Sequence, residues 1–509
     1  MDYNEIHETY LRLTPRVDSV PCIPLAYPET SLRHALEEYS RSICWTKDRI
    51  QGKLAWGASL RTQEFAVNTV TFSLASDPAC ELMPVLAGVQ NVRAMFSCPH
   101  YADNFEFLRR VVWKYGSNLQ LSPVLADHHM GIVSALHPSA VFPVYPMTTL
   151  GRISRRYYAP IAFNAGFFAC FKEQFDLGSA FGQPIGLLVI DGKTLVAPTF
   201  TQGTFLVNEE NQPSIEKTSM ADARITMVAD QGEVVTFAGS KLPNPSDANS
   251  SLRFVLMDPI EHTGSTYHNL STQVCVYTRS FGAETLSCSN PRVEISVTRN
   301  CIQEVRQNCY GKTPIPLLSY VISIPQKTFV QLFGDEQALN RRVSVDASLP
   351  RVGEIRHAFS GGPLVIHRSQ PLSKDTFYDS DNSLWTDDFI AGQVVPLETS
   401  ADIMDRYAPR TAIGLRTHPN KGDQVVVVTV NGATQKECTG GISLGQLTDY
   451  MVKLGCRDAL NLDGGGSSKL MLWGNQINDP GDIVMEAGIP VRKERPAPLA
   501  VVAKLLRVH

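Results

Sequence analysis

The sequence predicts an α+β fold in which strand-rich mixed sheets form most of the body and helices flank them. Two observations lead to this prediction. Short segments rich in Val, Ile, Thr and Phe, such as 66–74 and 185–190, recur along the chain and are typical of β-strands. Further on, a run of valines at 424–430 is followed by apolar residues at helical spacing over 443–454. This change of period indicates a buried strand followed by a helix.

Composition and charge exclude several classes of protein. Of the 509 residues, 43% are hydrophobic and 19% are charged, as in ordinary globular proteins. The net charge is −4 and Lys and Arg are scattered, so we expect no nucleic-acid partner. Residues 1–8 are polar and acidic, unlike a secretory signal, and no segment reaches the roughly 18 apolar residues of a membrane span. We therefore expect a cytoplasmic protein with no membrane span.

The eleven cysteines are dispersed without CxxC pairs. An odd number of cysteines without a secretory signal predicts reduced thiols rather than a disulfide framework. A disulfide between Cys301 and Cys309 is the alternative in an oxidising compartment.

The composition and the hydrophobic pattern of the sequence change along the chain. Residues 1–62 contain many prolines and only modest helical signals, so we expect an N-terminal extension of unknown role. Residues 63–509 are expected to form one domain. Within it, residues 92–157 are mixed in pattern, with an amphipathic helix predicted at 105–115, and are expected to be an elaboration of that domain.

Strands dominate the predicted domain, and their positions follow from alternation and from β-branched residues. Asp191 and Gly192 form a hairpin signal directly after one of them. Ser443 and Gly455 mark the two ends of the predicted helix, as its N-cap and as the glycine just beyond its last turn. The predicted strands are 66–74, 81–86, 185–190, 233–237, 252–257, 292–297, 424–430 and 459–462.

Two adjacent histidines, His128 and His129, follow Asp127 and raise the question of a metal site. Adjacent side chains in a strand point to opposite faces, so they make a poor pair of ligands for one metal ion. We expect a solvated or hydrogen-bonded loop here instead.

The clearest candidate site follows the last predicted strand. Asp463 stands at the end of this strand and is followed by three glycines and two serines, in the sequence LDGGGSS. Glycines accept positive φ and let a ligand approach their N–H groups, which in such a turn can bind an anion. The run is neither a P-loop nor a dinucleotide-binding motif. The alternative is a turn that Asp463 caps and that has no further function.

Two further polar segments adjoin apolar ones. Asn164 lies in an apolar stretch, where a buried amide must satisfy both its donor and its acceptor. Arg410, followed by Thr411, directly precedes the valine strand. A guanidinium matches a phosphate in geometry, although a lone Arg is more often part of a surface ion pair.

Two short segments complete the set of candidates. Gly361 and Gly362 form a glycine turn that leads into a predicted strand. Near the C-terminus Glu494 adjoins Arg495, an arrangement that is usually only a solvated pair. Each of these segments is ambiguous when taken alone.

In their order along the chain, these motifs resemble the phosphodiester glycosidase family. The blocks that carry the resemblance are NAGFF, GLLVIDGK, GGPLV, RTAIG, LNLDGGGSS and ERP, and the resemblance extends over residues 63–509. The sequence departs from the family pattern at Ala165, where a second glycine is common, and at residues 92–157, which are longer than the usual connection.

The resemblance implies an uncovering-enzyme-like catalytic domain and a hydrolase activity. Such an enzyme removes a sugar linked through its anomeric carbon to a phosphate, so its partner is a small molecule or glycan that carries a sugar-1-phosphodiester. Cleavage at an anomeric carbon passes through an oxocarbenium-like transition state and usually employs two carboxyl groups. Because phosphate is a good leaving group, a clamp for its negative charge matters more than a strong general acid.

The resemblance also implies roles for individual residues. Asp463 is the base or nucleophile and Glu494 its partner. Arg410 and Arg495 are assigned to the phosphate, and Asn164 to a sugar hydroxyl or acetamido group. The full set of expected substrate-binding residues is Asn164, Gly361, Gly362, Arg410, Thr411, Gly464, Gly465, Gly466, Ser467, Ser468 and Arg495.

Three alternatives stay open. Asp463 beside glycines can instead coordinate Ca²⁺ or Mg²⁺, but no ligand spacing requires this, so metal and cofactor stay unassigned. The chain can be a non-catalytic module that binds a sugar phosphate or nucleotide. It can also be the same class of enzyme acting on a nucleotide-derived substrate. The joint presence of Asp463, Arg410, Glu494 and Arg495 disfavours the module, since a decayed site is expected to lose at least one of them.

Overall fold

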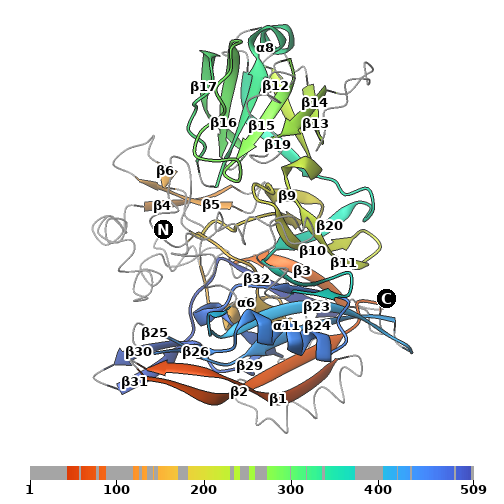
Figure 1. The fold of residues 1–509 in the computed structure, drawn as a ribbon, viewed down its shortest axis with the longest axis vertical. Coiled ribbons are helices and arrows are strands. Elements are labelled where there is room, and N and C mark those ends of the chain that lie inside the picture. The colour runs from red at the N-terminus through yellow and green to blue at the C-terminus, as the bar shows by residue number, and fades with distance from the viewer. Residues whose placement is uncertain are drawn as a thin grey trace.

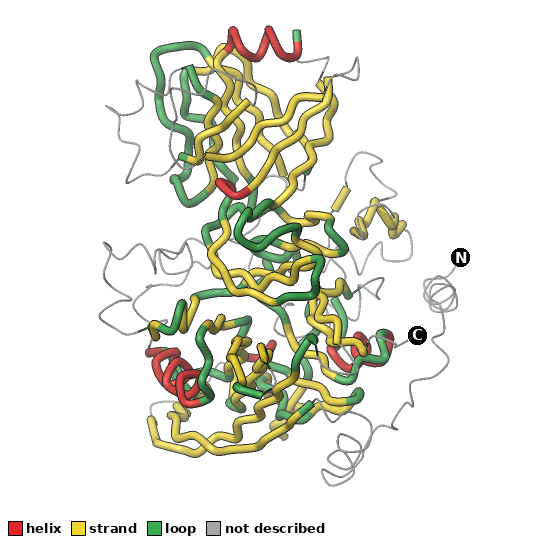
Figure 2. Tube along the Cα trace, turned by 90° about the vertical axis from the view of Figure 1, so that its right-hand side faces the viewer, coloured by secondary structure: helices red, strands yellow, loops and turns green. Residues whose placement is uncertain are grey.

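The protein is built mainly from β-strands arranged in three parts along its longest axis (Figure 1). A barrel with helix α8 lies at one end, a small sheet lies in the middle, and two sheets with helices α6 and α11 lie at the other end. Among the described residues, helices are confined to a few short segments (Figure 2). The computed structural model describes residues 43–56, 59–75, 80–87, 119–124, 129–134, 141–142, 147–169, 182–229, 234–240, 252–257, 272–298, 300–316, 318–334, 339–372, 405–420, 422–435, 438–486 and 489–505.

The largest sheet contains eleven strands, and every neighbouring pair is antiparallel except the parallel pair β25–β30. Its fifth strand, β24, is the predicted valine strand, and all of its residues from Gln424 to Val430 are buried, which confirms that both faces are covered. In sheet order the strands are β22 (Gln370–Pro371), β21 (Leu364–His367), β27 (Asp458–Asn461), β23 (Arg410–His418), β24 (Gly422–Val430), β2 (Ser59–Phe72), β1 (Cys44–Trp56), β26 (Cys438–Gly441), β25 (Ala433–Gln435), β30 (Asp482–Glu486) and β31 (Ile489–Lys493).

A second, five-stranded sheet shares one hydrophobic core with the first. Phe163 and Val501 from this sheet lie in the same buried cluster as Val427 and Leu460 from the large sheet. Strand β27 belongs to the large sheet and β28 to the second, so the glycine run between them carries the chain from one sheet to the other. In order the strands are β29 (Asn475–Gln476), β28 (Leu470–Leu472), β7 (Ile161–Asn164), β32 (Leu499–Leu505) and β3 (Cys80–Leu86).

The predicted helix is confirmed as α11 (Leu444–Lys453). Ser443 Oγ accepts a hydrogen bond from Gln446 N at 3.2 Å, while Gln446 Oε1 accepts one from Ser443 N at 3.2 Å. The helix ends just before Gly455, whose φ is +76°. The other α-helices in the described residues are α6 (Leu150–Arg156) and α8 (Gln326–Phe333). The fold is thus strand-rich, as predicted, but mostly β, and the α+β class holds only loosely.

The middle sheet carries the barrel as an insertion between two of its strands. Its order is β11 (Pro213–Thr218), β10 (Gln202–Asn208), β20 (Ile355–Ser360), β8 (Leu188–Ile190) and β9 (Lys193–Val196), and the predicted Asp191–Gly192 hairpin joins the last two. The single-turn 3₁₀-helix η2 (Met220–Asp222) leads from β11 into the barrel.

The barrel is closed and has its own hydrophobic core, which includes Phe237, Ile295 and Ile322. Three of its strands confirm predicted ones, namely 233–237, 252–257 and 292–297. In barrel order the strands are β12 (Ala223–Ala229), β13 (Val234–Ser240), β14 (Leu252–Leu256), β15 (Val274–Thr278), β18 (Tyr320–Pro325), β16 (Arg292–Thr298), β17 (Cys301–Cys309) and β19 (Leu339–Ala347).

The organisation of the N-terminal region can be compared with expectation only in part. The boundary expected after residue 62 falls inside β2, and β1 on its N-terminal side pairs with β2 along its whole length. Residues 44–56 therefore belong to the large sheet. In the expected elaboration, the described residues form α6 and a three-stranded sheet of β4 (Leu119–Val124), β5 (His129–Ser134) and β6 (Val141–Phe142). The predicted helix at 105–115 lies outside the described residues.

The alternative of a disulfide between Cys301 and Cys309 is wrong. The two residues are the first and last of the single strand β17, which holds them about 26 Å apart at the rise of an extended strand. A disulfide requires Cα atoms within about 7 Å. Both thiols are free. No helix among the described residues is long and apolar enough to cross a membrane.

Candidate functional site

The glycine run connects the two large sheets at the end of their shared core. β27 ends at Asn461, the single 3₁₀ turn η5 (Gly465–Ser467) follows, and β28 begins at Leu470 in the other sheet. Gly465 has a φ of +60°, a conformation that residues with a Cβ rarely adopt. The turn is therefore a crossing between sheets, and its glycines are required by the path of the chain.

Asn164, at the end of β7, fastens this crossing to both sheets. Its Nδ2 donates to the carbonyl oxygens of Asp463 at 2.7 Å and Ala165 at 3.2 Å. Its Oδ1 accepts from Thr411 Oγ1 at 2.8 Å and from Lys469 N at 2.9 Å. The amide is 3% exposed and fully used by the protein. The structure thus gives Asn164 and Thr411 a positioning role, in place of the substrate contact expected from the sequence.

Four backbone amides of the turn are occupied, so they do not form the expected anion-binding concavity. Gly464 N donates to Asp463 Oδ1 at 2.9 Å and Gly465 N donates to Pro409 O at 2.9 Å. The amides of Ser467 and Ser468 bond within the turn. The hydroxyls of Ser467 and Ser468 are buried and make no hydrogen bond to the described residues. These two hydroxyls are donors that the turn can offer to a ligand.

Asp463 is the carboxyl group at the centre of this arrangement. It keeps a small part of its surface exposed, yet burial raises its pKa to about 6. The Ser467 hydroxyl, the Arg495 and Lys469 charges and the Gly464 amide oppose this rise by favouring the carboxylate. The Ser467 hydroxyl acts by proximity, since its geometry falls short of a hydrogen bond. A carboxyl group with a pKa near neutrality is typical of acid–base catalysts.

Lys469 directly follows the two serines and was missed by the sequence analysis. Its side chain is 1% exposed, and burial lowers its pKa to about 8. Nζ donates to the carbonyl oxygen of Arg495 and lies 3.8 Å from Glu494 Oε1. The signal available in the sequence was a lysine directly before the apolar strand β28.

Arg495 already has a carboxylate partner within the protein. Its Nε donates to Asp482 Oδ2 at 2.8 Å and its Nη2 to Asp482 Oδ1 at 2.6 Å, a bidentate pair in which both groups are buried. Gly466 packs against this pair so closely that an added Cβ would lie 2.0 Å from Asp482 Oδ1 and 2.5 Å from Arg495 Nη2. Asp482 was also missed, and nothing in its sequence surroundings marks it.

Glu494 lies beside Lys469 and holds the start of α6. Its Oε1 accepts from Leu150 N at 2.5 Å and from Gly151 N at 3.4 Å. The start of α6 and the Lys469 ammonium both lie beside its carboxylate. The structure thus brings Glu494, Lys469, Arg495 and Asp463 into one network, with Glu494 oriented by two backbone amides.

Arg410 is placed differently from the expected phosphate site. Thr411 turns toward Asn164, so the alternation of strand β23 directs Arg410 to the opposite face. There its Nε donates to Ile442 O at 3.2 Å and its Nη2 to Arg406 O at 2.5 Å, with no acidic partner in the described part of the chain. Burial, and then the Arg406 charge, lower its pKa to about 10, and Asp463 is not among the groups that act on it.

Gly361 and Gly362, expected to bind substrate, lie next to the crossing between the two sheets. Gly362 N donates to Asn461 O at 2.8 Å, and Asn461 Nδ2 donates to Gly362 O at 2.7 Å. A Cβ on Gly361 would lie 2.5 Å from Asn461 O. The two glycines let the turn at 361–362 pack against Asn461 at the end of β27, two residues before Asp463.

The residues around Asp463 do not fit a divalent cation. Lys469 and Arg495 place two positive charges beside the carboxylate, whereas Ca²⁺ and Mg²⁺ require a set of oxygen ligands. Of the adjacent histidines that were expected to lie in a loop, His128 lies outside the described residues, whereas His129 is the first residue of strand β5.

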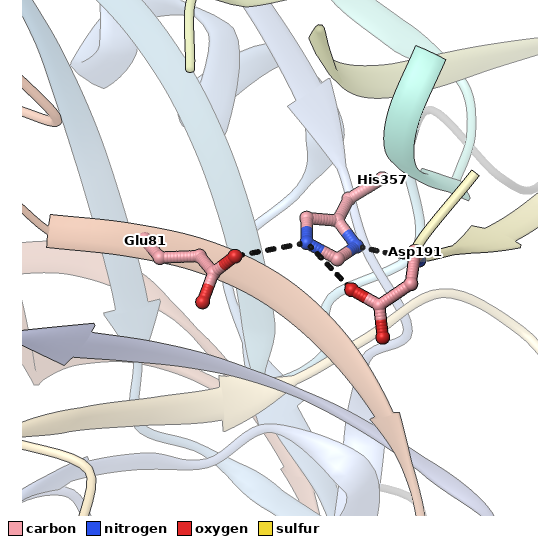
Figure 3. A group of neighbouring side chains, drawn as sticks. All are labelled: Glu81, Asp191 and His357. Carbon is pink, nitrogen blue, oxygen red and sulfur yellow. Dashed lines mark hydrogen bonds and ion pairs between the residues drawn. The ribbon is translucent and has the colours of Figure 1, made fainter. Parts of the chain in front are cut away.

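A second cluster, formed by Glu81, Asp191 and His357, could hold a metal by distance alone (Figure 3). His357 Nδ1 accepts from Asp191 N at 3.3 Å, which assigns the ring proton to Nε2, 3.4 Å from Glu81 Oε1. The Arg356 guanidinium already lies 2.5 Å from that oxygen. The cluster is therefore a hydrogen-bonded and ion-paired link between β3, β20 and the β8–β9 turn rather than a metal site.

Comparison with known proteins agrees with the resemblance seen in the motifs. Residues 294–502 match the family model described as phosphodiester glycosidase. This part of the chain is similar to phosphodiester glycosidases. Asp463, Lys469, Glu494 and Arg495 lie within the matched residues, whereas Asn164 lies before them.

The chain is also similar to named proteins. Over 73 residues the chain is 38% identical to N-acetylglucosamine-1-phosphodiester alpha-N-acetylglucosaminidase of Bos taurus. The matched stretch is 14% of this chain and only 12% of the bovine protein. A hypothetical protein from Synechocystis is 16% identical with a TM-score of 0.43, covering 91% of this chain and 62% of that one. The zebrafish N-acetylglucosamine-1-phosphodiester alpha-N-acetylglucosaminidase catalytic domain, auto-inhibited by its pro-peptide, is 9% identical with a TM-score of 0.38, covering 91% and 84%.

Proposed function

We propose that this protein is a hydrolase that cleaves a glycosyl–phosphate linkage and releases a sugar from a phosphate. The observation that carries the proposal is the carboxyl group of Asp463. It has a pKa of about 6, lies beside the cations Lys469 and Arg495, and belongs to the part of the chain that matches phosphodiester glycosidases. These are the two elements that the reaction requires, a group that reacts at the anomeric carbon and positive charge near the leaving phosphate.

Asp463 is proposed to act as base or nucleophile. With a pKa of about 6 it is mostly ionised at neutral pH, and it remains basic enough to accept a proton from an attacking water. As a nucleophile, the same carboxylate would form a bond to the anomeric carbon while the bond to the phosphate oxygen breaks. Water would then release the sugar in a second step.

The leaving phosphate is proposed to lie against the hydroxyls of Ser467 and Ser468, which make no hydrogen bond to the described residues. Lys469 and Arg495 supply charge at short range in a partly dry site, where such charge acts more strongly than in water. Arg495 acts mainly through its charge, because its Nε and Nη2 already donate to Asp482. Glu494 is the proposed second carboxylate, held by the start of α6.

The proposal is tested by incubating the protein with a synthetic sugar-1-phosphodiester, UDP-N-acetylglucosamine and cyclic dinucleotides, with product detection by mass spectrometry. Asp463→Asn should lower turnover about a hundredfold or more. The matched control is Asp423→Asn, which removes a carboxylate that is 42% exposed at the start of β24. Full activity in folded Asp463→Asn protein refutes the role of Asp463. Tight binding without turnover by the wild type identifies a binding module, and turnover of a nucleotide substrate alone identifies the nucleotide-specific enzyme.

A further inference from the structure

We propose that Lys469 is a positioning residue that fixes the glycine turn to the Glu494–Arg495 segment and tunes the charge of Asp463. The proposal deepens the proposed function, on which its activity measurements rest, but its central test needs no substrate.

Burial alone makes Lys469 unusual. Its side chain is 1% exposed, and a buried ammonium is costly unless partners compensate for the lost water. The compensation here is incomplete, because the described contacts are one carbonyl oxygen, that of Arg495, and the Glu494 carboxylate at 3.8 Å. A neutral side chain of similar volume would pack equally well, and replacing buried charges in this way is often neutral for stability. The position of a lysine here therefore indicates a use for its charge.

Lys469 is held at both ends by different parts of the site. Its backbone N–H donates to Asn164 Oδ1, and the same amide group holds the carbonyl of Asp463. Its ammonium donates to the carbonyl of Arg495. One residue thus ties the backbone of Asp463 to the backbone of the segment that carries Glu494 and Arg495.

The charges around Asp463 show why this link matters. Arg495 and, after it, Lys469 favour the carboxylate form. The Arg495 charge is matched by its bidentate pair with Asp482, whereas Lys469 faces Glu494 only at 3.8 Å. Loss of the ammonium would remove its own charge and also free the Arg495 carbonyl, so both cationic influences on Asp463 would weaken.

The test is a double-mutant cycle of Asp463→Asn and Lys469→Met, measured by urea unfolding of the full chain at pH 7.5 and pH 4.5. With Asp463 charged at pH 7.5, the effects of the two substitutions on the unfolding equilibrium constant should differ from additivity about fivefold or more. At pH 4.5 Asp463 is protonated and the departure should fall below about twofold. Additive effects at both pH values overturn the proposal.

Matched variants separate charge from packing. Lys469→Gln keeps a donor for the Arg495 carbonyl without the charge. It replaces Lys469→Met in the same cycle, with the same criteria, if the methionine variant does not fold. Lys453→Met removes a lysine that is 72% exposed on α11, and it should be additive with Asp463→Asn at both pH values. Coupling as large for Lys453 as for Lys469 overturns the assignment.

The activity measurements add a second readout. In Lys469→Met the acid limb of kcat/KM against pH should move up by about half a unit or more, since a nearby cation lowers the pKa of a carboxylate. Lys469→Arg should keep the wild-type limb. An unmoved limb in an active Lys469→Met protein overturns the tuning role. The two proposals can fail separately. If Asp463→Asn and Lys469→Met show the expected coupling in the unfolding cycle while the wild type cleaves no glycosyl phosphate, the positioning role of Lys469 stands and the proposed function fails.

Discussion

Replacing Asp463 with Asn should make the protein more stable at pH 8 while it removes activity. The substitution keeps the shape of the side chain and an acceptor for the Gly464 N–H, but removes the titration. Burial raises the pKa of Asp463 from 3.8 to about 6, a difference of 2.2 units. At 1.36 kcal/mol per unit, the charged form costs the folded state at most about 3 kcal/mol above pH 6. This value is an upper limit, because part of the side chain stays exposed.

The direction of the pH dependence follows from the raised pKa. A carboxyl group with a raised folded-state pKa contributes stability that is fully present below pH 3.8 and is lost as pH rises through about 6. Asp463→Asn should therefore gain up to about 3 kcal/mol over wild type at pH 8, and less than about 1 kcal/mol at pH 4. Urea unfolding at the two pH values measures both differences.

The matched control has the opposite sign. Arg457 and Thr417 hold the pKa of Asp423 below its usual value, so Asp423 contributes stability that is lost as pH falls. Asp423→Asn should therefore destabilise the protein at pH 8 and have little effect at low pH. The reasoning is refuted if Asp463→Asn is no more stable than wild type at pH 8, or if its gain is the same at pH 4 and pH 8.

Three further substitutions probe other contacts of the fold. Gly466→Ala places a Cβ against the Asp482–Arg495 pair and should cost about 1–3 kcal/mol in urea unfolding, with loss of turnover; a stable and active variant contradicts the close packing. His357→Leu removes the acceptor for Asp191 N and should cost about 1–3 kcal/mol without changing kcat, so a drop in kcat alone argues against a purely structural link. Ser443→Ala breaks the capping box of α11 and should cost about 1 kcal/mol by thermal unfolding, whereas an unchanged Tm would count against the cap.

Much of the fold could be predicted where local pattern decides it. The valine strand β24 and the helix α11 follow from the periods of a few neighbouring residues, and both are present with the expected caps or burial. The closure of residues 223–347 into a barrel could not be predicted, because it depends on partners far apart in sequence, such as β12 with β19. The same limit applies to β1, whose membership of the large sheet depends on its pairing with β2 and β26.

The site was predictable as a segment but not as a set of contacts. The glycine run, Asp463 and Glu494 were identified by residue type and order. Which face of a strand a side chain takes depends on the sheet around it, so the sequence could not show that the Arg410 guanidinium donates to backbone carbonyl groups away from Asp463. Lys469 and Asp482 were missed because their importance comes from buried partners, 26 and 13 residues away in the chain.

The four hydrogen bonds of Asn164 have a mechanical consequence. They join β7 in one sheet to Thr411 in the other and to both ends of the connecting segment, at Asp463 and Lys469. A slide of one sheet over the other would stretch these bonds together, in the part of the molecule where Asp463 is held. A displacement between the two sheets would thus act on the backbone of Asp463 in part through this one amide group, so the position of the carboxylate depends on how the two sheets pack.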